Sequence, residues 1–456
     1  MFDLIIHISR YLFALYMVIF LLNGAACILD ITKKYEFNTK KALSRQRIVI
    51  ILNHITAFLI LSYYPGEFRF NYSTLIIGIC GLIFLIAGHI LTSLAFRNGS
   101  KLMFNCVFFL LDIGFIMLMR LNTALAIRQI VWITAGLLIM LMIPWVLNIF
   151  PRFEKFEKLY IALGIFLIVL TFILGKEEFG SVNWIKIGSF GFQPSEIVKF
   201  LFIFYLASVF RKRVEFKELI LTGVLSAVIV IGLVLQKDLG GALIFFITYL
   251  TMLYISTSNT FLFMGGLAGA SLAATLAYNL FSHVRVRVMA WKNPWADIDK
   301  GGYQIAQSLF AITTWGFFGC GLTKGMPKSI PVVEKDFIFS AICEEFGVLF
   351  AIGVISVFII IFTVGMITAL RCERRYYSLI VIGINIMLAF QTFLIIGGVT
   401  KFIPLTGVTL PFISYGGSSI IISIAMIGLI QWVYSYQLEH DELDEIKVLE
   451  SECEYE

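Results

Sequence analysis

Charged residues are scarce in this chain. Only 14% of its 456 residues are Asp, Glu, Lys or Arg, and 59% are hydrophobic, whereas soluble domains carry about 25% charged and about 45–50% apolar residues. This composition excludes a soluble globular protein, and we expect no nucleic-acid partner. Windows of about 20 apolar residues predict a chain that crosses a membrane many times.

Paired cysteines, clustered histidines and a cleavable signal peptide are also missing. The seven cysteines are scattered without a CxxC pair, so we expect small buried hydrophobes and neither disulfides nor metal ligands. The five histidines are dispersed, which suggests no zinc site. The first apolar stretch, residues 11–29, follows one positive residue, Arg10, and is interpreted as a retained span.

The long apolar stretches predict an all-α, polytopic membrane protein with about 13 transmembrane helices. A backbone in lipid must satisfy its own hydrogen bonds, so each stretch is expected to be a helix. The stretches lie near 11–30, 49–64, 75–96, 103–120, 129–149, 158–174, 193–210, 218–235, 241–257, 261–281, 337–366, 377–397 and 411–435.

Positive residues in the short loops predict the orientation. In the thirteen-span arrangement the Lys- and Arg-rich loops all fall on one side, which is then the cytoplasm. The N-terminus is expected outside and the C-terminus inside. These positive loops are 31–48, 150–157, 211–217 and 367–376.

The loops on the outer side contain many Gly, Pro, Gln and Ser residues, which is typical of irregular backbone that lines a cavity. They are 175–192, 236–240, 282–336 and 397–410. The chain ends in an acidic segment, 437–456, which holds nine acidic residues against Lys447. A disordered, solvated tail is expected, with a cytoplasmic docking tail as the alternative.

The longest segment that cannot sit in a bilayer is 281–345. Asp336 stands near its far edge, where the next span begins. An ionised acid among cations suits a site where a pyrophosphate leaves and a hydroxyl loses its proton, while an ordinary helix cap is the alternative. The cations of this loop are Arg285, Arg287, Lys324, Lys328 and Lys335.

Several charges lie inside predicted spans, where they should pair or face a polar cavity. Glu196 and Lys199 are three residues apart on one helix face and form either a structural ion pair or part of a substrate site. Glu344 and Glu345 follow Asp336 at membrane depth. Arg128 at a span end is a substrate contact or a head-group anchor.

Two outer turns complete the set. Asp238 either caps the next helix or binds substrate. The stretch 397–419, which contains Ser414, is rich in Gly and Ser and leads into the last span. Such small residues permit close helix packing or a broken helix.

Together these segments resemble the shape, elongation, division and sporulation (SEDS) family, typified by FtsW, RodA and SpoVE. The resemblance covers about residues 103–436, roughly ten spans. The segments that carry it are QPSExxK at 193–199, QxDLG at 236–240, NPWAD at 293–297, GGYQxxQS at 301–308, DFIF with EExG at 336–347, and PxTGxxLPFxSYGGSS at 404–419.

The resemblance implies a ten-helix core at 103–436 with the large outer loop 282–336, preceded by a three-helix extension at 1–102. It also implies a peptidoglycan glycosyltransferase of the bacterial cytoplasmic membrane. Such enzymes polymerise lipid II at the outer face during division, elongation or sporulation, and work with a class B penicillin-binding transpeptidase. A lipid II flippase and a non-catalytic transpeptidase scaffold are the alternatives.

The family's essential aspartate corresponds to Asp336, which we expect to take a proton from the attacking sugar hydroxyl. The leaving pyrophosphate would be stabilised by protein cations or by a divalent cation, Mg or Mn. The candidate substrate-binding residues are Arg128, Lys186, Glu196, Lys199, Asp238, Arg285, Arg287, Gln304, Ser308, Glu344, Glu345 and Ser414.

The chain departs from the family pattern at four positions. Asn183 and Gly191 stand where family members carry Arg, and Glu334 and Lys335 replace a His and a Thr before the aspartate. We expect Lys186 to supply part of the missing positive charge. The three-helix extension has no counterpart in the family core, and a helical flank for a partner is its plainest interpretation.

Overall fold

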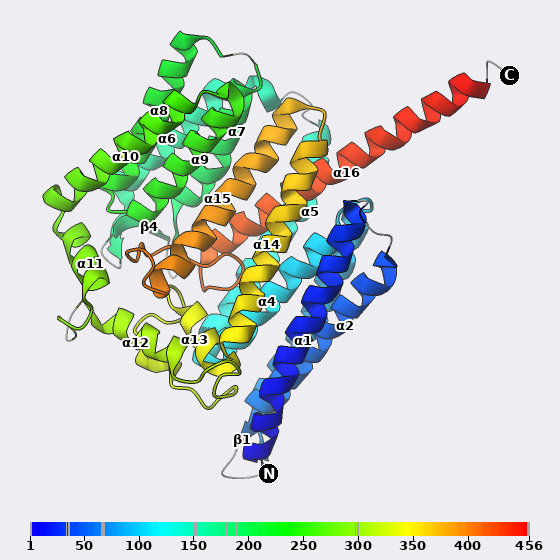
Figure 1. Ribbon diagram of the computed structural model, residues 1–456, viewed down its shortest axis with the longest axis vertical. Helices are drawn as coiled ribbons and strands as arrows, with labels where there is room; N and C mark the ends of the chain where they lie inside the picture. The colour runs from blue at the N-terminus through cyan, green and yellow to red at the C-terminus, as the bar shows by residue number, and fades with distance from the viewer. Residues whose placement is uncertain are drawn as a thin grey trace.

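The computed structural model describes residues 2–32, 34, 37–64, 69–149, 153–178, 181–187, 190–212, 214–296, 298 and 301–453. These residues form a helical bundle with a few short strands at one end (Figure 1). The helices are α1 (Phe2–Ile31), α2 (Thr39–Ser62), α3 (Tyr72–Ala95), α4 (Lys101–Leu121), α5 (Thr123–Ile149), α6 (Glu157–Leu174), α7 (Pro194–Phe210), α8 (Phe216–Leu235), α9 (Leu239–Thr257), α10 (Thr260–Leu280), α11 (Ser282–Lys292), α12 (Tyr303–Thr313), α13 (Ile338–Phe346), α14 (Val348–Arg371), α15 (Arg375–Val399) and α16 (Gly417–Cys453).

The strands form two small antiparallel sheets. β1 (Tyr63–Tyr64) pairs with β2 (Arg69–Phe70), and β4 (Ser181–Ile187) lies between β3 (Lys176–Glu178) and β5 (Phe190–Phe192). Two 3₁₀ turns, Phe153–Lys155 and Pro327–Ser329, complete the described elements.

Twelve helices of the described chain are long and apolar enough to cross a membrane. α7 is the thirteenth long helix; it has 17 residues, and its Val198, Phe202 and Leu206 are buried in the same bundle. The prediction of an all-α polytopic membrane protein is confirmed, and the thirteen expected stretches correspond to these helices.

Polar side chains begin several of the helices. Asn38, Ser100 and Asp238 each accept a hydrogen bond from the backbone N–H three residues ahead, at the starts of α2, α4 and α9. These caps satisfy N–H groups that have no partner within the helix. Pro194 begins α7, where its missing N–H removes no helical hydrogen bond.

One predicted span, 337–366, is wrong as a continuous helix, because Gly347 separates α13 from α14. Gly347 has a φ of +90°, and a Cβ there would lie 2.3 Å from the Phe317 carbonyl oxygen. The N–H groups of Val348 and Leu349 donate to the carbonyls of Gly316 and Phe317. The outer loop therefore satisfies the start of α14, and only glycine adopts this conformation in so little space.

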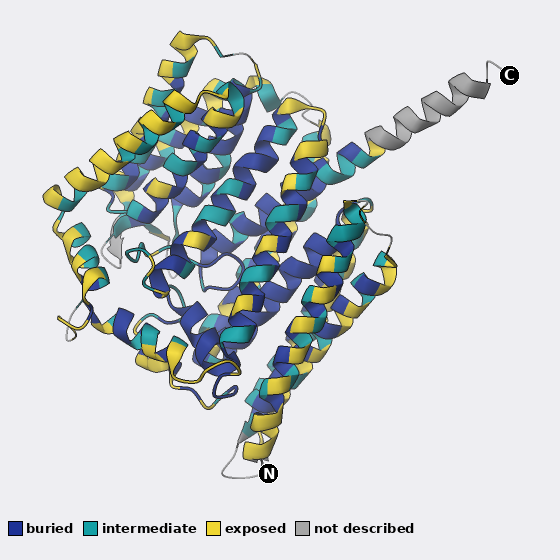
Figure 2. Cartoon of the chain, viewed as in Figure 1, coloured by how far each residue is buried: buried dark blue, intermediate teal, exposed yellow. Residues whose placement is uncertain are grey.

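α4 lies at the centre of the molecule, and all the residues of its 18-residue apolar stretch are buried. α1, α2 and α3 lie together along one side of it, and the later helices occupy the other side (Figure 1). Figure 2 shows the contrast between buried α4 and the exposed edge helix α10. None of the residues of α10 is buried, so α10 presents most of its surface to lipid.

Buried polar side chains join the three extension helices to α4. Asp112 of α4 accepts hydrogen bonds from Asn53 (2.9 Å) and lies 2.6 Å from Nδ1 of His54, both on α2. Nε2 of the same imidazole lies 2.9 Å from the Gly78 carbonyl on α3. Both ring nitrogens of His54 therefore face oxygen atoms, and this one imidazole connects α2 to α4 and to α3.

A second polar network lies about two turns away along α2 and α4 and about three turns away along α3. Asn105 of α4 donates to Gln46 of α2 and accepts from His89 of α3, and Gln46 donates to the Phe20 carbonyl on α1. Such groups are costly to separate in lipid. Hydrogen bonds as well as apolar packing therefore join the extension to the core.

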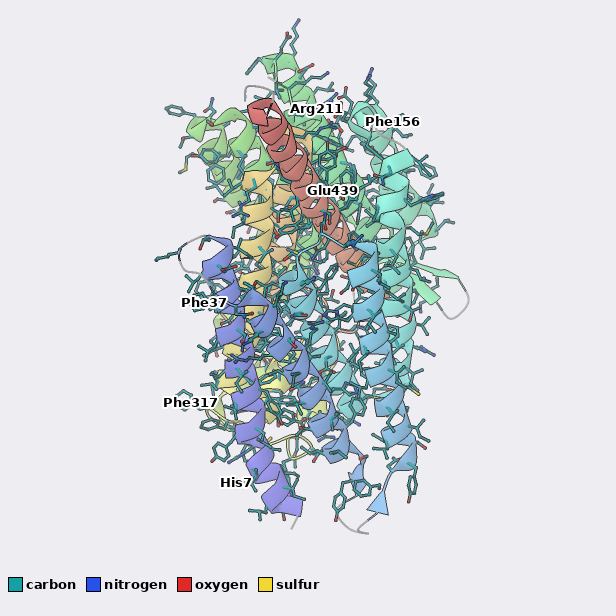
Figure 3. All side chains as sticks on the ribbon, turned by 90° about the vertical axis from the view of Figure 1, so that its right-hand side faces the viewer. His7, Phe37, Phe156, Arg211, Phe317 and Glu439 are labelled. Atoms are coloured by element: carbon teal, nitrogen blue, oxygen red, sulfur yellow. The ribbon has the colours of Figure 1, made fainter. Side chains whose placement is uncertain are left out.

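The two ends of the bundle differ in the loops that they carry. Phe156 and Arg211 lie towards one end, and His7 and Phe317 lie towards the other (Figure 3). The backbone of α16 is helical through the acidic tail to Cys453, where a disordered or docking tail was predicted. Its side chains beyond Glu439 lie outside the described residues, as do Lys33, Arg152 and Arg213 of the positive loops and Asp297 of the NPWAD segment.

Candidate active site

A cavity of about 430 Å³ opens among α5, α7, α9, α11, α15 and β4, at the end of the bundle that carries the loops 332–336 and 406–419. Its lining includes seven of the thirteen residues proposed from the sequence. These are Arg128, Lys186, Glu196, Lys199, Asp238, Arg287 and Asp336.

The cavity carries an excess of positive charge. Six basic and three acidic side chains line it: Arg128, Lys186, Lys199, Lys237, Arg287 and Lys335 against Glu196, Asp238 and Asp336. Positive charge gathered in a cleft concentrates anions. The site is therefore suited to a ligand with a phosphate or pyrophosphate group.

Asp336 ends a tight backbone turn. The N–H groups of Lys335 and Asp336 both donate to the Val332 carbonyl, at 3.1 and 3.3 Å. Val332 has a φ of +58°, which is strained for a β-branched residue. Such strain persists only where surrounding contacts impose it, and it is common at functional sites.

The loop before α16 holds this turn in place. Ser414 Oγ donates to the Lys335 carbonyl at 2.5 Å, and the Tyr415 N–H donates to the Glu334 carbonyl at 2.9 Å. Ser414 Oγ also accepts from the Leu410 N–H. Ser414 thus fixes the backbone beside Asp336, and it does not line the cavity as the predicted substrate contact.

Burial raises the pKa of Asp336 to about 6, because the carboxylate loses water on most sides. Lys335 and Arg287 oppose this shift, and Glu334 adds to it. The side chain still opens on the cavity. A carboxyl group with this pKa is ionised near neutral pH and is a stronger base than a solvated aspartate.

Arg287 and Asp336 meet across Gly407. A Cβ on Gly407, whose φ is +78°, would lie 3.6 Å from Arg287 Nη2 and 3.8 Å from Asp336 Oδ2. Arg287 Nη1 donates to the Thr406 carbonyl at 3.0 Å. The loop 406–407 therefore fixes the guanidinium beside the carboxyl group.

Lys199 and Glu196 form a buried ion pair in the first turn of α7. Lys199 Nζ donates at 2.9 Å to both oxygens of Glu196 and to Gln391 Oε1 on α15. Gln391 in turn donates to the Thr409 carbonyl. The pair links two helices to the loop at Thr409, as the structural role predicts, and it also lines the cavity, where its contact with substrate stays a prediction.

Asp238 caps α9 and faces the cavity at the same time. It accepts hydrogen bonds from the Gly241 N–H (2.8 Å), Asn183 Nδ2 (3.1 Å) and Gln193 Nε2 (3.2 Å). Asn183 stands where the family pattern has Arg, and here its amide is a partner of the carboxylate. These amides and the carboxylate form a surface suited to sugar hydroxyl and acetamido groups.

Lysines supply the positive charge that the chain lacks at positions 183 and 191. Lys186, Lys237 and Lys335 all line the cavity. Lys335 Nζ lies 5.6 Å from the centroid of the Trp184 ring, a cation–π distance. Lys186 was expected here, and Lys335 was named among the cations of the loop, whereas Lys237 was not singled out.

Five further candidate residues lie away from the cavity: Arg285, Gln304, Ser308, Glu344 and Glu345. Arg285 is exposed and donates to the Asn279 carbonyl. Ser308 bonds to Ser340 Oγ and the Val399 carbonyl. Gln304 lies part-buried on α12, which does not contribute to the cavity wall.

Glu345 is buried in a different cluster, with Arg120 at the end of α4. Arg120 Nε donates to Glu345 Oε1 at 2.9 Å, and Arg120 Nη2 donates to the Thr323 and Gly325 carbonyls. Burial raises the pKa of Glu345 to about 7, against the effect of Arg120. Glu344 accepts from the Met326 N–H. The acidic pair therefore fastens the outer loop, and sequence reasoning missed Arg120 because it ends an ordinary apolar span.

The described residues contain no group of three or more His, Cys, Asp or Glu side chains placed to hold a metal ion. Glu196 is paired with Lys199, and Asp238 is occupied by three N–H donors. A divalent cation in this cavity would be held mainly by the phosphates of a ligand.

Residues 93–439 match the sequence profile of the FtsW, RodA and SpoVE family, described as cell cycle proteins. The peptidoglycan glycosyltransferase RodA of Mycobacterium tuberculosis is 33% identical over 322 residues, which are 66% of this chain and 69% of that protein. The probable peptidoglycan glycosyltransferase FtsW of Bacillus subtilis is 34% identical over 296 residues, 61% of this chain and 73% of that protein. That of Saccharophagus degradans is 35% identical over 327 residues, 66% and 81% of the two chains.

Solved structures share the fold. A chain from a study of how a peptidoglycan synthase complex coordinates polymerization and crosslinking superposes with a TM-score of 0.65 and 26% identity, over 74% of this chain and 98% of that chain. The rod shape determining protein RodA of Thermus thermophilus superposes with a TM-score of 0.54 and 24% identity, over 74% and 96%.

Proposed function

The chain belongs to the FtsW, RodA and SpoVE family, and we propose that it joins lipid-linked glycan units in the cavity beside Asp336. It is a multi-pass membrane protein and a peptidoglycan glycosyltransferase. The observation that carries the proposed mechanism is one part-buried carboxyl group, with a pKa of about 6, on the wall of a cavity rich in cations.

Asp336 acts as the general base. Its carboxylate takes the proton of the 4-hydroxyl of the acceptor N-acetylglucosamine as that oxygen attacks the anomeric carbon of the donor. The new C–O bond forms on the face opposite the breaking bond, so the configuration at that carbon inverts. The hydroxyl proton ends on the Asp336 carboxyl group, from which it passes to solvent through the open cavity.

The cavity cations stabilise the leaving group. The bond between the anomeric carbon and the pyrophosphate oxygen breaks, and the electron pair leaves with the undecaprenyl pyrophosphate. Arg287 lies beside Asp336, with Lys335 and Lys186 on the same wall, so the developing negative charge is met close to where it forms. Pyrophosphate needs no proton to leave, which explains how one carboxylate suffices where glycosidases use two.

The acceptor sugar is oriented by the polar surface around Asp238. Asn183, Gln193 and Asp238 form one connected set of donors and acceptors on the cavity wall. Fixed hydrogen-bonding groups of this kind hold a reacting hydroxyl near its attack position, which lowers the entropic part of the barrier. Lipid II, with its disaccharide and pyrophosphate, matches both parts of the cavity.

The proposed orientation places this cavity on the outer face of the bacterial cytoplasmic membrane. Phe156, in the positive loop 150–157, and Arg211, at the start of the positive loop 211–217, lie towards one end of the bundle, whereas Phe317 of the loop 282–336 lies towards the other (Figure 3). Loops rich in Lys and Arg remain in the cytoplasm. A class B penicillin-binding transpeptidase is the proposed partner. This is supported by the similarity to a chain of a synthase complex that couples polymerization to crosslinking.

Asp336→Asn tests the assignment in purified full-length protein supplied with lipid II and the partner transpeptidase. The amide keeps the shape of the side chain but cannot accept the proton, so we expect glycan polymerisation to fall at least 100-fold, in line with the usual contribution of a general base. Polymer length and yield are read on gels. Asp30→Asn, at the far end of α1, is the matched control and should polymerise normally.

Three results would contradict the proposal. Full polymerisation by Asp336→Asn would remove the base from the mechanism. Movement of lipid II across reconstituted vesicles by a protein that forms no polymer would favour a transporter. Absence of both activities in the unaltered protein, with transpeptidase recruitment intact, would indicate a scaffold.

A further inference from the structure

One face of α1 follows the outer loop and the helix break next to it. Asp3, Ile6, Arg10, Phe13 and Met17 are spaced by three or four residues, so they share this face. Ile6, Phe13 and Met17 are buried. All five lie outside residues 93–439, the part of the chain that matches the family profile.

The outer half of this face binds the loop 318–324. Arg10 Nη1 donates to the Gly319 carbonyl at 2.9 Å, and Asp3 forms an ion pair with Lys324. The Tyr11 ring lies 4.9 Å from the Phe318 ring, centroid to centroid. These contacts hold the loop 318–324 against α1.

Glycine lets the loop approach α1 closely. Gly321 has a φ of +98°, and a Cβ there would lie 2.4 Å from Ile6 Cγ2. No other residue could keep this backbone conformation and this distance. The loop is therefore shaped to the surface of α1.

The inner half of the face packs on the helices that follow Asp336. The Phe13 ring meets the Phe346 ring of α13 edge-on, with centroids 4.8 Å apart. A Cβ on Gly353 of α14 would lie 2.2 Å from Met17 Cγ. α1 thus touches both sides of the break at Gly347.

The loop and α13 form one hydrogen-bonded unit. The N–H groups of Cys320 and Gly321 donate to the Glu344 and Glu345 carbonyls, at 2.9 and 3.0 Å. Arg120 fastens the same unit from the α4 side. α13 begins at Ile338, two residues after Asp336, so a shift of this unit moves the proposed base.

We propose that α1 is a built-in positioning element that holds the Asp336 segment in its working geometry. The inference rests on the proposed function, because it assigns Asp336 as the base. α1 is itself fixed: the polar networks of His54–Asp112 and Gln46–Asn105 bind the extension to α4. Among the residues of α1, Arg10 is the clearest positioning residue, because its side chain joins α1 to the loop by a directional hydrogen bond. A displacement of about 1 Å in a catalytic group costs up to about 100-fold in rate.

Arg10→Ala in the full-length chain, assayed with lipid II and the partner transpeptidase, tests this role. We expect kcat to fall about tenfold and KM for lipid II to stay within about twofold, because the cavity that binds lipid II is intact. Hydrogen exchange of the backbone from 316 to 347 should become faster, while that of 404–416 stays unchanged. Arg10→Lys keeps a donor for the Gly319 carbonyl and should restore most of the rate. Leu15→Ala, on the exposed face of α1, should behave as the parent protein.

A second variant covers the case in which Arg10→Ala does not fold. The double variant Tyr11→Ala, Lys324→Ala removes contacts made by side chains that are about half exposed, and it should show the same loss of kcat. A folded Arg10→Ala protein with kcat within about twofold of the parent, or an unchanged double variant, would overturn the proposal.

Asp336→Asn in the same series separates the two hypotheses. If it stays active, the base assignment fails; if it is inactive while Arg10→Ala is normal, only the positioning role fails.

Discussion

Asp336 illustrates how a single residue depends on its surroundings. Burial raises the pKa of its carboxyl group, and the neighbouring Lys335 and Arg287 limit that rise. The result, a pKa of about 6, is useful for a base that must be ionised at neutral pH and still hold a proton during transfer. The strained turn at Val332 and the Ser414 hydrogen bond to the Lys335 carbonyl keep the group in this environment.

The raised pKa predicts the pH dependence of polymerisation. A general base works only when deprotonated, and Asp336 loses its proton as pH rises through about 6. We therefore expect kcat/KM to fall about tenfold for each pH unit below 6 and to level off above about pH 7. Initial rates of lipid II consumption from pH 5 to 8 measure this. A flat profile between pH 5 and 7 would contradict the assignment.

Lys335→Gln is the matched variant for this profile. Lys335 lowers the pKa of Asp336, so its removal should move the midpoint to higher pH while the shape of the curve stays the same. A midpoint that does not move would show that the profile reports another group.

The residues of the site differ in how far neighbouring residues in the sequence reveal their role. Asp336, Glu196, Lys199 and Asp238 could be proposed from the sequence, because charge in or beside an apolar span is conspicuous. Gln391 gave no such signal, since one amide in a long apolar helix has no local pattern. The role of Glu345 could not be assigned either, because its partner Arg120 is 225 positions away.

At the scale of elements, the break between α13 and α14 organises the end of the molecule that carries Phe317. Gly319 and Gly347 touch backbone to backbone: a Cβ on Gly319 would lie 2.5 Å from the Gly347 nitrogen. Both have positive φ, +69° and +90°. The apolar residues on both sides of Gly347 predict helix correctly, but they predict one continuous span, because hydropathy does not detect a turn in the backbone.

Gly347→Ala should disrupt this junction. A Cβ would lie 2.3 Å from the Phe317 carbonyl oxygen, and the backbone conformation of Gly347, φ +90° and ψ 165°, alone costs a residue with a Cβ about 1–3 kcal/mol. We expect the thermal unfolding midpoint in detergent to fall and polymerisation to drop at least tenfold, since Asp336 lies on the displaced segment. Gly269→Ala on α10, where a Cβ meets nothing within 4 Å, is the control and should be neutral or slightly stabilising. An unimpaired Gly347→Ala variant would show that the break is not required.

At the scale of the whole molecule, the extension and the core form one bundle. The resemblance of the motifs predicts a boundary close to residue 102, and the family profile begins at residue 93, near the end of α3. The contacts cross that boundary. Asp112, inside the first core helix, has its partners on α2. A boundary drawn from the family alone would leave these groups unpaired in lipid, which is costly. The domain limits proposed here, 1–102, 103–436 and 437–456, thus describe similarity to the family more than independence in folding.

The His54–Asp112 network predicts how that joining can be broken and restored. His54→Leu leaves Asp112 with Asn53 as its remaining partner in a buried, low-dielectric site. Removing one member of a buried pair costs about 3–5 kcal/mol, whereas replacing all members by apolar groups of similar size is often neutral. We therefore expect His54→Leu to lower the unfolding midpoint strongly. The triple variant with Asn53, His54 and Asp112 all changed to Leu should recover most of the loss and keep polymerising, because α1 then remains in place on the outer loop. If the triple variant were as unstable as the single one, the hydrogen bonds themselves, and not the avoidance of an unpaired charge, would hold the extension to the core.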